Sequence, residues 1–195
     1  MKKISRIFSI PGPVLMVAMV IFTSVQLIGQ AALERPADWA KKVEGLSFRN
    51  LYMLNDSIFR SEQPDSLEFV QLYNYGIRSI LNLRDHHTDR EGAKSVPLTL
   101  YDVAMNAKAF TDEEIVKALK VLDKSPKPVL VHCKQGSDRT GVVLAMYRII
   151  FQGWTKAQAL DELEHGGYDF HEKYANIPEY IRNVNIGKIK AEVKN

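Results

Sequence analysis

The sequence predicts an α/β fold in which a central sheet is flanked by helices. Strand-like segments come first and helices gather in the second half of the chain. A short all-apolar run at Val129–Val131 has the character of a buried central strand. A length of 195 residues accommodates one ordinary domain and a leader. The sequence contains neither internal repeats nor a second domain.

The first half of the chain is dominated by strand patterns. Apolar residues on both sides of a turn at residues 55–56 predict a β-hairpin. A helix follows, in which apolar residues recur on one face until Gly76 stops it. The predicted elements are strands at Leu51–Leu54 and Ile58–Arg60, a helix at Ser66–Tyr75, and strands at Ile77–Leu83 and Val96–Val103. The polar run between the last two strands, Asp85–Glu91, is expected to be an exposed loop.

Two capping boxes mark helix starts in the second half. Thr111 with Glu114, and Thr155 with Gln158, have the spacing in which a hydroxyl and an acidic or amide side chain satisfy unpaired amides. The predicted elements are a helix from Thr111 that ends before Pro126, the strand Val129–Val131, a helix at Thr140–Phe151, a helix from Thr155 to Gly166-Gly167, and a last helix at Ile177–Val184.

Charge is distributed unevenly along the chain. The net charge is +3, and the first thirty residues supply three of the 26 Lys and Arg residues and none of the 23 Asp and Glu residues. The remainder therefore has 23 basic and 23 acidic side chains. A nearly neutral domain argues against a nucleic-acid-binding surface.

The N-terminus has the pattern of an export signal. A basic start precedes an apolar stretch, and small residues precede a cleavage position after Ala31. Residues 1–31 are predicted to be a signal peptide or an uncleaved membrane anchor, since Ile10–Ile28 approaches the roughly 20 residues that span a bilayer. Residues 32–49 are then a linker and residues 50–195 the folded domain. The domain is expected in the periplasm or anchored to the membrane, facing the periplasm or exterior.

Residues 129–141 have the order of a buried strand, a tight polar loop and a helix. Loop amides and a helix N-terminus that meet in one concavity form a site for an anion. Gly136 permits backbone angles that a β-carbon resists. Arg139 adds a planar fork that can bind two phosphate oxygens. The segment predicts a phosphate-binding loop between a central strand and a helix.

Cys133, the single cysteine of the chain, lies inside this loop. One cysteine excludes an internal disulfide. The positive field of the loop favours the thiolate, so Cys133 is expected to be nucleophilic near neutral pH. Thr140 is placed to donate its hydroxyl to the sulfur. His132 is expected to orient the loop through hydrogen bonds rather than to act as a base.

The run His132-Cys133, five further residues and Arg139-Thr140-Gly141 resembles the signature of the protein tyrosine phosphatase superfamily, in its dual-specificity branch. Two upstream stretches, Phe59–Pro64 and Gly76–Arg84, are similar to segments of bacterial and atypical dual-specificity phosphatases. The resemblance covers roughly residues 50–186.

The resemblance implies a dual-specificity phosphatase-type fold and a two-step reaction through a phosphocysteine on Cys133. Arg139 is implied to hold the phosphate oxygens. No metal or other cofactor is expected, because the loop supplies the positive field and one cysteine with five scattered histidines shows no paired ligand spacing. The residues expected to bind phosphate are Lys134, Gln135, Gly136, Ser137, Asp138 and Arg139.

Three readings of the general acid remain open. The family uses an Asp from a separate loop to protonate the leaving oxygen. Asp102, 31 residues before Cys133, is our prediction, although alignment on the following helix points instead to Asn106, which cannot supply a proton. Asp138 is a second candidate, because it resembles the Asp-Arg-Thr ending of myotubularin-like lipid phosphatases. If no Asp serves, aryl phosphates or phosphoanhydrides are favoured as better leaving groups.

The expected partner is a phosphorylated protein substrate, and the alternative is a phosphoinositide or an inositol polyphosphate or pyrophosphate. Lys134 is either a solvated surface lysine or an added charge for a multiply phosphorylated substrate. Arg60 and Arg84 are expected either to reach the site or to pair with a carboxylate. A rival of another class is a pseudophosphatase that binds phosphorylated ligands without catalysis.

Overall fold

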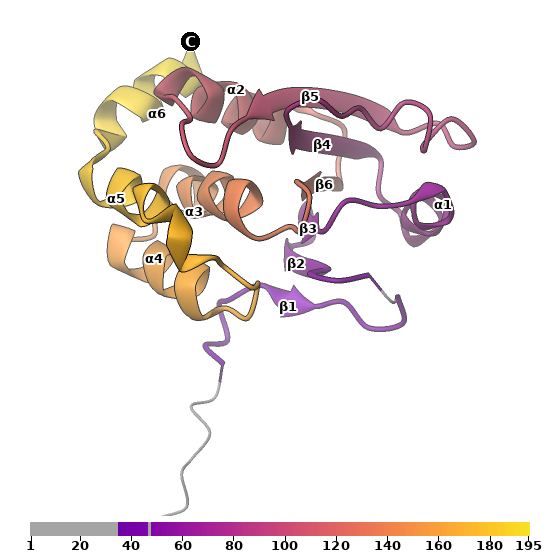
Figure 1. Cartoon of the computed structure of the whole chain (residues 1–195), viewed down its shortest axis with the longest axis horizontal. Coiled ribbons are helices and arrows are strands. Elements are labelled where there is room, and N and C mark those ends of the chain that lie inside the picture. Colours follow the sequence, from indigo (N-terminus) through magenta and orange to yellow (C-terminus); the bar gives the residue numbers. More distant parts are fainter. Residues whose placement is uncertain (1–34, 47) are drawn as a thin grey trace, which may run out of the picture. The chain divides into compact units, whose positions relative to one another are not determined.

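The structure, a computed structural model, describes residues 35–46 and 48–195 (Figure 1). Its framework is a six-stranded sheet with the order β1-β2-β3-β6-β4-β5. The β1–β2 and β2–β3 pairs are antiparallel, whereas the β3–β6, β6–β4 and β4–β5 pairs are parallel. The strands are β1 (Lys41–Lys42), β2 (Tyr52–Asn55), β3 (Ile58–Ser61), β4 (Ser79–Arg84), β5 (Thr99–Met105) and β6 (Val129–His132).

Helices cover both faces of the sheet. In Figure 1, α1 lies on one side, and α2 to α6 lie on the other. Three of the helices, α1, α2 and α4, begin with a capping box. The helices are α1 (Ser66–Tyr75), α2 (Asp112–Lys124), α3 (Asp138–Gln152), α4 (Lys156–His165), α5 (Asn176–Asn183) and α6 (Ile186–Lys194), with a 3₁₀ turn at Glu172–Tyr174.

Alternation along the strands divides the core into two layers. Ile80 and Leu130 belong to the cluster under α1, and their neighbours Leu81 and Val131 belong to the cluster under α2 and α3. All four residues of β6 are buried, as expected of a strand covered on both faces. Because β3, β4, β5 and β6 are parallel, their carboxyl ends share one edge of the sheet, which is where sites form in such folds.

The predicted α/β class is confirmed, and α1 has the predicted bounds. β5 lies two to three residues later than its prediction, and α3 begins at Asp138 rather than Thr140. Two elements are missing from the predicted set. β1 consists of two lysines, which carry no apolar pattern, and α6 contains Gly187, which weakens a helix signal.

The segment before β2 packs against the domain although its residues are expected in a linker. β1 pairs with β2, and Ala40, Val43 and Phe48 are buried. The predicted signal or anchor lies outside the described residues. Among residues 35–46 and 48–195, no helix combines the length and the apolar character needed to cross a bilayer.

A buried ion pair joins α3 to α4. Glu162 accepts hydrogen bonds from Arg148 Nε at 2.8 Å and Nη2 at 2.7 Å. The same carboxylate accepts from the Tyr168 hydroxyl at 3.0 Å and from the Ala40 amide at 2.6 Å. Arg35 Nη2 donates to the Tyr168 hydroxyl at 2.8 Å, so the N-terminal segment also enters this network.

We expect Glu162→Gln to lower the free energy of unfolding by about 3 kcal/mol, because Arg148 would remain buried without its counter-charge. Urea unfolding measures the change. Glu164→Gln is the matched control: Glu164 lies 3.6 Å from the exposed Arg182, and its loss should cost under about 0.5 kcal/mol. Equal losses of unfolding free energy in the two variants would contradict a stabilising role for the buried Arg148–Glu162 pair.

Candidate active site

The loop formed by residues 133–137 joins β6 to α3 at the carboxyl edge of the sheet. Its first residue, Cys133, is 3% exposed. Because α3 begins at Asp138, Arg139 lies in the first turn of that helix. The order of strand, loop and helix predicted for residues 129–141 is therefore present.

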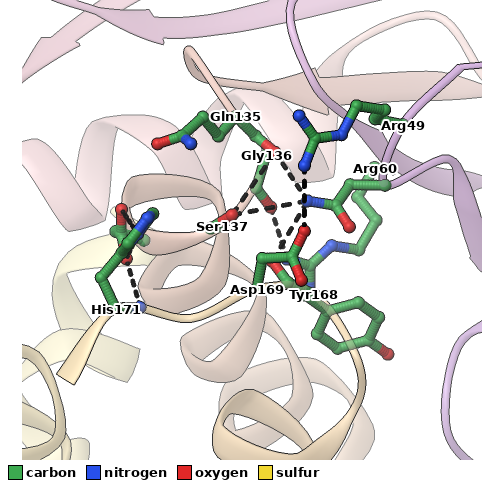
Figure 2. Close-up of polar contacts among 10 residues, drawn as sticks. Arg49, Arg60, Gln135, Gly136, Ser137, Tyr168, Asp169 and His171 are labelled. Atoms are coloured by element: carbon green, nitrogen blue, oxygen red, sulfur yellow. Dashed lines mark hydrogen bonds and ion pairs between the residues drawn. The ribbon is translucent and has the colours of Figure 1, made fainter.

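The carbonyl groups of the loop face the surrounding protein. Five successive carbonyl oxygens each accept a hydrogen bond from a different residue, and Figure 2 shows the contacts at Gln135 and Gly136. The donors are His132 Nδ1 to Cys133 O (3.1 Å), the Gln63 amide to Lys134 O (3.3 Å), Asn50 Nδ2 to Gln135 O (2.7 Å), Arg60 Nη2 to Gly136 O (2.5 Å) and the Gly141 amide to Ser137 O (2.9 Å).

This pattern fixes the direction of the loop amides. In a trans peptide the C=O and N–H groups point in opposite directions. Outward carbonyls at residues 133–137 therefore turn the N–H groups of residues 134–138 toward the inside of the loop. A concave row of N–H groups at a helix N-terminus favours an anion. The loop can thus bind phosphate through the backbone donors of Lys134, Gln135, Gly136, Ser137 and Asp138.

Gly136 lets the loop approach the end of β3. Its φ is +70°, a conformation that favours glycine. A β-carbon at this position would lie 2.3 Å from the Ser61 carbonyl oxygen, which is too close for any real contact. The glycine is therefore required by both backbone conformation and space.

Two acceptors hold Arg139 beside the loop. Its Nη1 donates to Asp85 Oδ1 at 2.8 Å and to the Met105 carbonyl at 3.1 Å. Asp85 follows β4 and Met105 ends β5, so the two neighbouring strands position the guanidinium. Within the described residues its Nε and Nη2 have no partner, and this edge is free to bind two phosphate oxygens.

His132, which precedes Cys133 in the chain, and Thr140, in the first turn of α3, are both fully buried. The imidazole is held from two sides, because Nε2 lies 2.7 Å from Asp89 Oδ2 and Nδ1 lies 3.1 Å from the Cys133 carbonyl. The Thr140 hydroxyl has no hydrogen-bond partner among the described residues, as expected of a group kept free to donate to the sulfur.

A cavity of about 270 Å³ opens beside Arg139 and is lined by Asn106, the residue that alignment on the following helix points to. Asp102 does not line it. That residue lies inside β5, where its exposed carboxylate accepts from Asn82 Nδ2 at 3.1 Å. The other lining residues are Asp85, Ala107, Lys108, Arg139 and Tyr174.

Asp138, the second candidate acid, faces the segment between α4 and α5. Its carboxylate accepts from the His171 amide at 3.1 Å and lies 3.0 Å from His171 Nδ1 (Figure 2). These contacts anchor that segment to the start of α3. Lys134 and Gln135 are exposed at the loop surface, and Arg84 donates to Gln63 Oε1.

Sequence reasoning missed Asn50, Asp85 and Asp89. The two aspartates belong to the polar run expected to be exposed, yet Asp89 is 3% exposed because it pairs with His132. One signal was present for Asp85: it directly follows a parallel strand, and side chains at that position reach the site edge. No local pattern marks Asn50, whose role depends on a contact 85 residues away.

Comparisons with known proteins agree with this geometry. The family described as Tyrosine phosphatase family matches residues 46–195. The dual specificity protein phosphatase TpbA of Pseudomonas aeruginosa is 30% identical over 168 residues, which cover 85% of this chain and 75% of TpbA. Inositol diphosphatase DSP2 of Oryza sativa subsp. japonica is 33% identical over 125 residues, covering 60% of this chain and 61% of that protein.

The comparison with solved structures leads to the same group of phosphatases. The crystal structure of P. aeruginosa TpbA matches with a TM-score of 0.74 at 29% identity, covering 83% of this chain and 99% of TpbA. A second TpbA structure is a complex with pTyr. The loop with Cys133 and Arg139, the parallel strands around it and the match over residues 46–195 lead to one conclusion: the chain belongs to the tyrosine phosphatase family.

Proposed function

We propose that this protein is a cysteine-dependent phosphomonoester hydrolase of the protein tyrosine and dual-specificity type. The observation that carries the proposal is the inward-facing row of loop amides, with Cys133 at its start and Arg139 at its end. TpbA, which shares 30% of the aligned residues, is named a dual specificity protein phosphatase. The proposed substrate is a phosphorylated protein, with phosphotyrosine as the first candidate.

In the first step the Cys133 thiolate attacks phosphorus, a P–S bond forms and the ester P–O bond breaks. The departing oxygen leaves with its electron pair and takes a proton from solvent water. Loop amides and the free edge of Arg139 stabilise the charge that builds up on the equatorial oxygens. In the second step water attacks phosphorus and loses a proton. The P–S bond breaks, inorganic phosphate leaves, and Thr140 stabilises the returning thiolate.

Proton supply decides which esters react well. The cavity beside Arg139 is lined by Asn106, whose amide has no acidic proton, and the Asp85 carboxylate there already accepts from Arg139. An aryl or phosphate oxygen leaves with less protonation than an alkyl oxygen. We therefore infer that no Asp serves as a dedicated acid and that phosphotyrosine is cleaved faster than phosphoserine.

A second candidate substrate is an inositol pyrophosphate, whose phosphoanhydride is also a good leaving group. Lys134 is exposed on the loop, and Lys108 lines the cavity beside Arg139, so two ammonium groups flank the site. The rice relative is named an inositol diphosphatase. In a phosphate-release assay, faster turnover of an inositol pyrophosphate than of a phosphotyrosine peptide would favour this substrate.

We also propose that the chain is exported and acts in the periplasm or at the membrane surface that faces it. The basic start and apolar stretch of residues 1–31 support this placement. Fractionation of cells with mass analysis of the chain tests it. A mature chain in the periplasmic fraction is expected, and the full-length chain found only in the cytoplasm contradicts the proposal.

Cys133→Ser should abolish phosphate release from an aryl phosphate while the variant still binds phosphate, because the amide row is unchanged. Arg139→Lys should reduce kcat/KM by about 10³-fold, since an ammonium cannot replace the planar edge. Arg182→Lys, on the exposed face of α5, is the control and should match the wild type. An active Cys133→Ser variant would refute the nucleophile assignment.

Asp102→Asn should change kcat for phosphotyrosine peptides by less than about three-fold, because the carboxylate lies within β5 and outside the cavity. Asp102 is nonetheless the acid that the sequence pattern predicts, so the variant discriminates between the two readings. A loss of about 10²-fold or more, larger for phosphoserine than for phosphotyrosine, would restore Asp102 as the proton donor.

A further inference from the structure

Arg60 is a buried arginine directly behind the phosphate-binding loop. It is 3% exposed and lies on β3, where it pairs in register with Val131 of β6. Side chains alternate along strands, so Arg60 shares the α3 face of the sheet with Val131 and Cys133. The guanidinium therefore sits on the same side of the sheet as the nucleophile.

The contacts of Arg60 connect it to the loop and to one aromatic ring. Its Nη2 donates to the Gly136 carbonyl at 2.5 Å, and its guanidinium carbon lies 3.5 Å from the centroid of the Tyr168 ring (Figure 2). Its Nε is buried and has no hydrogen-bond partner among the described residues. Arg60 lines a small cavity of about 10 Å³ that is also lined by Gly141 and Glu162.

No carboxylate forms an ion pair with Arg60 in the described part of the chain. Glu162 is the acidic side chain beside the cavity, but its two oxygens bind Arg148, Tyr168 and the Ala40 amide. Burial lowers the pKa of the Arg60 guanidinium, and neighbouring Tyr168, Glu162 and Cys133 act in the opposite direction. A buried charge without a counter-ion is costly unless an anion is present at some stage.

Two other side chains around the loop differ from Arg60, because each lies against a carboxylate. Arg139, from α3, is paired with Asp85, and the His132 imidazole, from β6, contacts Asp89. The remaining charged side chains of the loop region are the exposed Lys134, and Asp138, which faces His171. Arg60 is faced by Tyr168, Glu162 and Tyr52. Glu162 is the carboxylate among these three, and it is already paired with Arg148, so no carboxylate of the described residues pairs with Arg60 itself.

We propose that Arg60 is a positioning residue whose buried charge stabilises the Cys133 thiolate and whose hydrogen bond to Gly136 holds the loop open for phosphate. The inference rests on the proposed function, because the anions that compensate Arg60 are then the thiolate and the substrate phosphate. A neutral donor would satisfy the Gly136 carbonyl equally well. The charge itself is what the thiolate requires.

The test is the pH dependence of Cys133 alkylation by iodoacetamide in the full chain, where the single cysteine gives an unambiguous signal. The thiolate is the reactive form, so the midpoint pH of alkylation reports its stability. Arg60→Gln should raise this midpoint by about one pH unit, the shift expected on loss of a nearby opposite charge. Arg60→Lys, which keeps the charge, should raise it by less than half as much.

Tyr168→Phe is the matched control, because it keeps the ring under Arg60 and removes only the hydroxyl, which contacts Glu162 and Arg35. It should lower the thermal stability while leaving the alkylation midpoint unchanged. A folded Arg60→Gln variant with the wild-type midpoint would overturn the proposal and leave Arg60 a purely structural role. If Arg60→Gln does not fold, the test uses Arg60→Lys, which retains the charge. A rise of a full pH unit in the alkylation midpoint of Arg60→Lys would then also overturn the proposal.

Alkylation needs no turnover, so this result is separate from the proposed activity. If the wild-type protein releases phosphate from no ester or anhydride, the proposed function fails, while the midpoint shift still reports on Arg60. If turnover is present but the shift is absent, the function stands and the role of Arg60 falls.

Discussion

The direction of the backbone between β6 and α3 is the constraint on which the site depends. Five successive carbonyls point outward, and each accepts a hydrogen bond from the surrounding protein. The donors come from the segment before β2, from β3 and the residues after it, from β6 and from α3. The strand order of the sheet gathers these segments around one loop. The phosphate site is therefore a property of the whole fold.

The charges around the loop fall into two kinds. Arg139 and His132 each face an aspartate, which fixes their orientation, and Asp85 balances much of the Arg139 charge. The loop amides and Arg60 have no such balance among the described residues. Positive potential is thus concentrated where the thiolate and the phosphate meet. The side chains that are paired with an aspartate fix the geometry of the loop, and the loop amides and Arg60 supply the positive field.

Local patterns were sufficient for part of this account. The α/β class, the central β6 and α1 follow from periodicity and turn residues, and the loop follows from its spacing of Cys133, Gly136 and Arg139. The supporting residues did not follow, because Asn50 and Asp85 act across sequence separations of 85 and 54 residues. Nor could the sequence show that Asn106 lines the cavity while Asp102 lies outside it, because this depends on where β5 ends.

The most direct test of the central claim is to trap the phosphorylated enzyme. The full chain would be mixed with an aryl phosphate, quenched rapidly in acid and digested, and the peptide that contains Cys133 would be weighed by mass spectrometry. The account predicts a gain of one phosphoryl group on Cys133 during turnover, and none in the presence of excess inorganic vanadate. Steady turnover with an unmodified Cys133 and a phosphoryl group on another side chain would contradict it.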